Sequence, residues 1–191
     1  EWKIVTVGTV VDFAHGRGLP KSDIREGAER KCIHYGQLFT EYSEKVGEIR
    51  SRTDATDNVF LSKSNDVLIP TSDVTPRGLA TASCIKEDGV ILGGGILVLR
   101  PKADIDGCFI SYFVTNNKNT VLKLVKGSTV FHLYAKDLSQ LEVYIPPTVE
   151  EQTAIVTVLE EMSLEINLLR KQRDKLNSLK QGMMHELLAG N

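Results

Sequence analysis

The chain has 191 residues, 41% of them hydrophobic, and its 23 basic and 25 acidic side chains give a net charge of −2. This length allows one compact domain with an appendage or two small domains. The near-neutral charge argues against a protein that holds nucleic acid by bulk electrostatics, and no apolar run approaches the ~20 residues that a membrane span needs.

The first three quarters of the chain predict a mixed α+β domain. The β-branched residues 2–11 predict a strand, alone or beside a short helix, and the Gly/Pro/charge stretch 15–23 predicts an exposed loop. Residues 107–126 predict one or two helices. Short apolar or β-branched runs predict further strands at 31–35, 58–62, 66–70, 89–92, 95–99, 129–134 and 140–145. Strands mixed irregularly with few helices favour an α+β fold with a mixed, largely antiparallel sheet.

A long helix is predicted after the double proline Pro146-Pro147. Two prolines end the preceding strand because neither has a backbone N–H and the ring fixes φ. Thr148 and Glu151 have the spacing of a capping box, in which Thr148 accepts a bond from an early amide of the helix. A helix of roughly 40 residues is about 60 Å long. The boundary therefore predicts a domain over residues 1–147 and a long helix over 148–191.

The predicted helix carries a narrow stripe of the kind that pairs with another helix. Ten positions follow a 4-3 spacing, and eight of them are apolar. These seam positions are Ile155, Leu159, Met162, Ile166, Leu169, Arg173, Leu176, Lys180, Met183 and Leu187. Arg173 and Lys180 either set the register of the pairing or lie at its rim with their heads in water, and the sequence leaves both possibilities open.

Nothing in the sequence predicts catalysis or a metal centre. Gly93-Gly94-Gly95 lacks the spacing of a nucleotide-binding loop and predicts a tight turn between strands. The four histidines lie at no metal-ligand spacing to one another or to cysteine. The three cysteines form no C-x-x-C pair, a usage that is typical of a protein in a reducing cytoplasm. Cys108 lies in an apolar run that predicts a core position.

The order of these features resembles one half of a type I restriction-modification specificity subunit. Trp2 with Gly16-x-Gly18, followed by Ile33-x-Tyr35-Gly36-x-Leu38, is similar to the start of its target-recognition domain. The most specific part is the junction Ile145-Pro146-Pro147-x-x-Glu150-Glu151-Gln152 with the heptad stripe behind it. The full subunit of that family has two recognition domains and two spacer helices, whereas this chain has one of each.

The resemblance implies a subunit without chemistry of its own, with residues 1–147 as the DNA-reading domain and 148–191 as the spacer helix. Its implied partners are double-stranded DNA, methyltransferase subunits and a motor-nuclease subunit. S-adenosylmethionine, Mg²⁺ and ATP are implied only for those partners. From the seam we expect an antiparallel homodimer and hence a split, twofold-symmetric target with half-sites about 10 bp apart.

Loop residues are the candidates for DNA contact, because Arg and Lys can bond guanine edges while hydroxyls fix phosphates. The candidates are Arg17, Lys21, Arg30 and Lys31 in the first loop, Thr71, Ser72 and Arg77 in the stretch 70–83, and Lys126, Ser128, Thr129 and His132 around Gly127. The alternative function is a protein–protein adaptor with a β-rich head on a dimerising coiled coil. The target bases cannot be derived from the sequence.

Overall fold

The structure, a computed structural model, describes residues 1–190 and divides into two compact units. The first, here called the β-rich unit, is Glu1–Thr153, and the second begins at Ala154. The elements follow in the order β1 (Lys3–Thr6), α1 (Val7–Val10), β2 (Val11–His15), η1 (Lys21–Asp23), β3 (Arg30–Ile33), α2 (Gln37–Thr40), β4 (Arg52–Thr53), β5 (Phe60–Leu61), β6 (Val67–Pro70), β7 (Ser72–Asp73), η2 (Pro76–Ala80), β8 (Ser83–Cys84), β9 (Ile91–Leu92), β10 (Ile96–Pro101), α3 (Gly107–Asn116), α4 (Lys118–Leu122), β11 (Lys126–Gly127), β12 (Phe131–His132), α5 (Ala135–Leu138), β13 (Glu142–Ile145) and α6 (Val149–Leu188).

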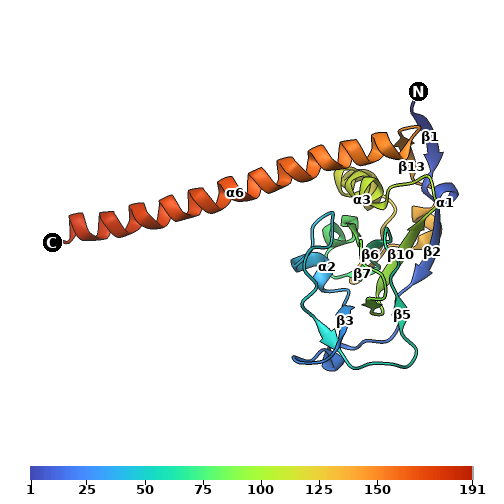
Figure 1. Ribbon diagram of the computed structural model, residues 1–191, viewed down its shortest axis with the longest axis horizontal. Helices are drawn as coiled ribbons and strands as arrows, with labels where there is room; N and C mark the ends of the chain where they lie inside the picture. Colours follow the sequence, from blue (N-terminus) through green and yellow to red (C-terminus); the bar gives the residue numbers. More distant parts are fainter. Residues whose placement is uncertain (191) are drawn as a thin grey trace. The chain divides into compact units, whose positions relative to one another are not determined.

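Four small sheets build the β-rich unit (Figure 1). Two of them have four strands, in the orders β2-β10-β6-β8 and β4-β3-β9-β5. A three-stranded sheet has the order β11-β12-β7, and β1 pairs with β13 alone. Every strand pairing is antiparallel except that of β3 with β9. The predicted α+β class with a mixed, largely antiparallel sheet is therefore confirmed.

The core lies between the two four-stranded sheets. Leu68 of β6 and Val98 of β10 pack in one cluster with Ile33 of β3 and Leu92 of β9, and Leu38 of α2 closes that cluster. The side chains of β6 and β10 that point away from this cluster are also fully buried. Helix α3 contacts β6 and β8. Both faces of the central strands are thus covered, which explains why β6 and β10 read as continuous apolar runs.

The predicted loop at 15–23 is only partly exposed. Leu19 is 3% exposed and packs against Cys32 and Ile91, although its φ is +56°. The prediction of an exposed loop is wrong at this residue. One apolar side chain among charged and glycine neighbours gives no periodicity from which its burial could be inferred.

The glycine run forms the predicted tight turn, between β9 and β10. Gly95 has a φ of +82°, and the Gly93 amide donates to the Ile33 carbonyl. A Cβ on Gly16 would lie 2.1 Å from the Gly93 carbonyl oxygen, so the two backbones can approach only because residue 16 has no side chain. The turn therefore holds the first loop against the central sheet.

The start of α6 is fixed by polar contacts inside the β-rich unit. The Glu151 amide donates to the Thr148 hydroxyl over 3.2 Å, which is half of the predicted capping box. The Glu151 carboxylate accepts a 2.9 Å bond from the Trp2 indole. In a complete capping box this carboxylate would accept a bond from the Thr148 amide. The bond that the structure gives it comes from the Trp2 indole instead.

A buried polar junction joins the same turn of α6 to α3. Gln152 is 1% exposed, and its Oε1 accepts from the Asp106 amide over 2.8 Å. The Asp106 carboxylate accepts from the Cys108 amide, from Lys86 Nζ and from the Thr153 hydroxyl. Burial raises the pKa of this carboxyl, but these donors and the Lys86 charge outweigh burial and hold it below its ordinary value.

Cys108 lies at this junction as the predicted core residue, with 1% exposure. All three cysteines are free and buried. The Cys84 and Cys108 thiols share a hydrogen bond, and that bond with burial raises the pKa of Cys84.

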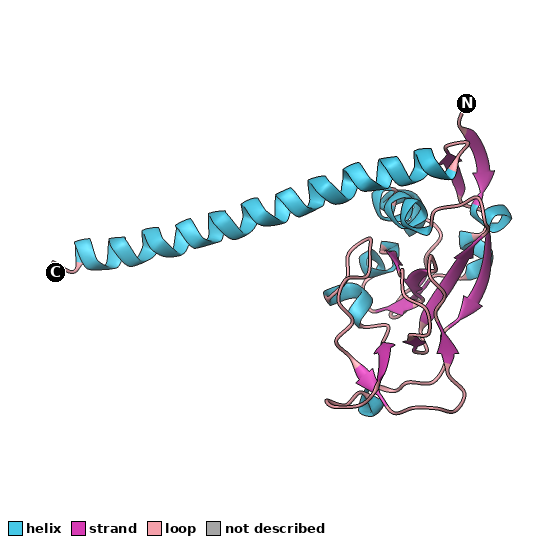
Figure 2. Ribbon diagram, in the orientation of Figure 1, coloured by secondary structure: helices cyan, strands magenta, loops and turns pink. Residues whose placement is uncertain are grey.

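Helix α6 runs without a break from Val149 to Leu188 (Figure 2), which confirms the predicted long C-terminal helix. Its seam side chains from Met162 onward are largely exposed, with Leu176 at 64% and Leu187 at 72%. Arg173 bonds its neighbour Asp174 over 2.8 Å. None of the described helices combines the length and hydropathy that crossing a bilayer requires.

Candidate nucleic-acid interface

Two of the three predicted DNA-contact groups meet in one place, the sheet β11-β12-β7. Ser72 lies opposite His132 in the pairing of β7 with β12, and His132 lies opposite Lys126 in the pairing of β12 with β11. Helix η2, which carries Arg77, contacts both β7 and β12. Ser128 and Thr129 are exposed in the turn between β11 and β12. Segments that are far apart in the sequence therefore present one polar surface.

Backbone register brings His15 to the same surface. Strand β10 lies between β2 and β6, so that Leu97 faces His15 on one side and Ile69 on the other. The ends of β2 and β6 therefore lie at the same end of this sheet, on either side of β10. Thr71, which follows β6, accepts the Leu133 amide over 3.0 Å and so joins this edge to β12.

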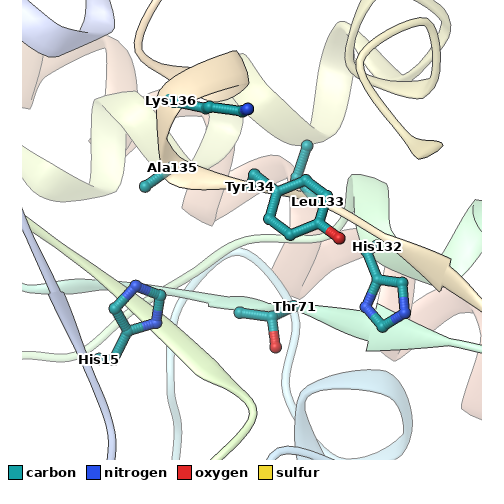
Figure 3. Close-up of a pocket in the computed structure, with 7 residues that line it drawn as sticks. All are labelled: His15, Thr71, His132, Leu133, Tyr134, Ala135 and Lys136. Atoms are coloured by element: carbon teal, nitrogen blue, oxygen red, sulfur yellow. The ribbon is translucent and has the colours of Figure 1, made fainter.

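The result is an open hollow of about 530 Å³. We call it the β12 hollow, and it is lined by His15, Thr71, His132, Leu133, Tyr134, Ala135 and Lys136. In Figure 3 the two imidazoles lie on either side of Thr71, with the phenol ring and the ammonium group above them. The rings of His132 and Tyr134 stack with centroids 5.9 Å apart and planes 27° apart.

The acidic side chains nearest in sequence to this surface are engaged inside the unit. Lys126 Nζ lies 2.8 Å from both oxygens of Asp137, so this predicted DNA-contact residue has its charge partly neutralised. The Asp73 carboxylate accepts from the Val74 amide and from the Thr75 hydroxyl. The pair of Lys126 with Asp137 therefore adds no net charge to this surface, and Asp73 is an acidic residue at its edge.

The four predicted residues of the first loop divide into two pairs. Arg17 and Lys21 are exposed, and the structure gives neither side chain an ion pair. Arg30 donates to the Ala55 carbonyl over 2.8 Å, and Lys31 lies 2.6 Å from Glu87. Arg30 and Lys31 therefore have contacts within the domain, and their predicted role at DNA stays a prediction.

Lys21 borders a second open hollow, of about 580 Å³, which Tyr35 and Gln37 also line. The His34 ring packs on Tyr35 with centroids 4.5 Å apart. Burial, with the nearby Lys21 charge, lowers the pKa of His34 and favours its neutral form. Aromatic rings beside an exposed ammonium group suit stacking against a sugar or base.

Three side chains of the β12 hollow with polar groups, His15, Tyr134 and Lys136, were not predicted from the sequence as DNA contacts. A usable signal existed for two of them, since His15 lies in residues 15–34 and Lys136 in residues 117–136, two stretches in which basic side chains outnumber acidic ones. Tyr134 gave none, because an exposed aromatic residue after a short strand has many possible roles. Within residues 1–190 no group of three or more His, Cys, Asp or Glu side chains is arranged to hold a metal ion.

Comparison with known proteins gives the family context. The family model described as "Type I restriction modification DNA specificity domain" matches residues 1–178. The type I restriction enzyme MjaVIII specificity subunit of Methanocaldococcus jannaschii is 22% identical over 98% of this chain and 42% of its own length. The chain therefore spans less than half of that relative.

Two solved structures share the fold. The crystal structure of a type I restriction-modification system S subunit from M. genitalium matches with a TM-score of 0.62 at 17% identity, over 99% of this chain and 46% of that one. A structure from a study of complex assembly in a type I R-M system matches with a TM-score of 0.68 at 22% identity, over 94% of this chain and 43% of that one.

Proposed function

Because the chain belongs to the type I restriction modification DNA specificity family, we propose that it reads one half of a bipartite DNA target for a methyltransferase and restriction complex. Residues 1–147 are the reading domain in this proposal, and α6, Val149–Leu188, is the spacer and dimerisation helix. The chain itself performs no chemistry. It acts in the cytoplasm with methyltransferase subunits that bind S-adenosylmethionine and with a motor-nuclease subunit that uses ATP and Mg²⁺.

The observation that carries the proposal is the meeting of separate polar loops on one surface. Ser72 and His132 pair in one sheet, Thr71 just before it accepts the Leu133 amide, and Arg77 lies in the helix η2 that flanks the sheet. Arg77 is exposed and has no ion pair in the described part of the chain. An exposed Arg can bond guanine O6 and N7, and flanking hydroxyls fix phosphates. Arg77 is therefore our candidate for reading a base.

The near-neutral charge of the chain supports a division of labour with the partner subunits. Each phosphate contact adds salt-dependent affinity, and the exposed cations here are too few to hold a duplex tightly. We expect the isolated chain to bind DNA feebly and the complex with methyltransferase subunits to bind it firmly.

The charges along α6 support an antiparallel homodimer. Its first part, to Glu165, contains five glutamates and no basic residue, whereas residues 170–180 contain five basic residues and one acid. Two parallel copies would place like charges side by side along the whole helix, which is unfavourable. Antiparallel copies remove this end-to-end repetition: when the seam pairs from end to end, residues 160–165 of each helix lie toward Lys180 of the other, while residues 170–172 still face their own counterparts.

The proposal is tested by co-purification with the cognate methyltransferase subunit, followed by selection from a randomised duplex pool. A stable complex that enriches a split, twofold-symmetric site is the expected result. An asymmetric site would show that the chain acts as one half of a two-domain subunit. If no complex forms and no sequence is enriched, the proposal is wrong and the adaptor function takes its place.

The role of Arg77 is tested in the same selection. Arg77→Ala is expected to relax the preference at one target position, with a cost of about 1–3 kcal/mol on the preferred sequence. Lys3→Ala is the matched control, since Lys3 is equally exposed but lies in β1, in a different sheet. If both variants select the same sequence as wild type, Arg77 does not read a base.

A further inference from the structure

The β12 hollow differs in chemistry from a site that reads bases. Its seven lining residues include no Arg, Asn or Gln, so that Lys136 alone belongs to the side chains that form paired bonds to purine edges. What it presents is a cation, two imidazoles, a phenol and a threonine. Such groups bond phosphate and sugar oxygens, which carry no sequence information.

The hollow also has the charge and shape that a backbone unit requires. None of the residues that line it is acidic, and the adjacent carboxylate of Asp137 is held by Lys126. Lys136 is exposed, and the structure gives its ammonium group no partner. A volume of about 530 Å³ is larger than one phosphate needs, and the stacked rings of His132 and Tyr134 supply a wall against which a deoxyribose can pack.

The rigidity of the hollow suits an anchor. Thr71 donates its amide and its hydroxyl to the Gly95 carbonyl, and its own carbonyl accepts the Leu133 amide. The ends of the strands β6, β10 and β12 are thereby joined at the floor of the hollow. A site fixed in this way can set the register of the duplex relative to neighbouring base-reading side chains.

We propose that the β12 hollow binds one sugar–phosphate unit of the target duplex and positions it, with Lys136 and the Tyr134 hydroxyl on the phosphate and His15 and His132 flanking it. This inference rests on the proposed function, and it assigns three residues that have no role so far. Lys136 and Tyr134 contribute affinity to every DNA sequence and selectivity to none.

The test measures binding of the complex with methyltransferase to two duplexes, the selected site and the same site with one half scrambled, over a range of salt concentrations. Lys136→Gln is expected to weaken both by about tenfold. The slope of log affinity against log salt concentration should become less steep by about 0.9, the value for one phosphate contact. Tyr134→Phe, which removes only the hydroxyl, should weaken both duplexes equally with no change in slope.

Lys3→Gln is the matched control and should leave both affinity and slope near wild type. The proposal is overturned if Lys136→Gln behaves like Lys3→Gln, or if it changes the ratio between the two duplexes, which would make Lys136 a base reader. In both cases the proposed function stands as long as the wild-type complex still selects a site. A wild-type complex that selects no DNA would overturn both this inference and the proposed function.

A second arm separates DNA from free phosphate as the source of the anion. Inorganic phosphate is titrated into the complex while the imidazole resonances of His15 and His132 are followed by NMR. Only weak binding is expected, because a free anion lacks the sugar contacts and the rest of the duplex. Tight, DNA-independent binding that wild type shows and Lys136→Gln loses would identify a small-anion site and overturn the proposal.

Discussion

At the scale of single residues, Asp106 shows how one carboxylate can organise a junction. It caps α3 through the Cys108 amide and also binds Lys86 and Thr153. Its side chain is 7% exposed, so a charge here is tolerated only because donors surround it. Neighbours far apart in sequence thus share one acceptor.

Asp106→Asn is expected to destabilise the chain by about 1–3 kcal/mol at neutral pH, since it removes a buried, charge-assisted acceptor. The pKa of the carboxyl is lowered by folding, so its contribution is full above the pKa of the unfolded chain, near 3.8, and is lost as the pH falls through the lower folded-state pKa. The deficit of the variant should therefore shrink in acid. Urea unfolding between neutral and acidic pH measures it.

Asp104→Asn is the control, because the Asp104 side chain is exposed two residues away. A deficit of the Asp106 variant that does not change with pH would show that the residue acts through shape and not through its charge.

Residue by residue, the candidate site was predictable only in part. Thr71, Ser72 and Arg77 were selected because glycine and proline marked their stretch as irregular, and they do lie with His132. His15 was missed because its position depends on how β10 pairs with two strands that are distant in sequence. No spacing along the chain encodes such a register.

At the scale of elements, those that a local sequence pattern defines were predicted, and most of those that form only by contact with a distant segment were not. The proline stop before α6, the apolar runs of β6 and β10 and the helical segment 107–126 all appear in the fold. Whereas the two-residue strands β5, β9 and β12 lie in apolar runs that were predicted, the equally short β4, β7, β8 and β11 gave no pattern. Leu19 belongs to the same class, since its burial depends on Cys32 and Ile91.

Thr148→Ala is expected to lower the free energy of unfolding by about 1 kcal/mol, because the Glu151 amide loses its acceptor at the start of α6. Thr148→Ser keeps the oxygen and should restore most of the loss. Urea unfolding followed by circular dichroism measures both. Equal stability of the alanine variant and wild type would mean that water replaces the cap without cost.

At the scale of the whole molecule, the predicted antiparallel pairing has one register that uses every seam position. In it Leu169 lies opposite Arg173 of a second copy, and Ile155 lies opposite Leu187. The seam then pairs from end to end, which buries the most apolar surface. Surface charge pairs are worth little beside this burial, so they favour the direction more than the register.

Cysteine cross-linking tests this register, since the three native thiols are buried. A mixture of the single variants Leu169→Cys and Arg173→Cys is expected to form a disulfide-linked heterodimer on mild oxidation. Leu169→Cys alone should remain uncross-linked. Cross-linking of Leu169→Cys with itself would indicate parallel helices, and cross-linking with Ile166→Cys would indicate a slip of one heptad.

The pairing of β1 with β13 bears on how such a chain can evolve. Lys3 lies opposite Ile145, so the first and last strands of the β-rich unit are hydrogen-bonded neighbours (Figure 1). A segment whose two ends meet can be cut out and replaced by another of the same design without moving the sequence on either side. Recombination at two short sites would then exchange one set of loops for another while leaving α6 unaltered. A new preference could arise in a single genetic event, with the assembly surfaces inherited intact.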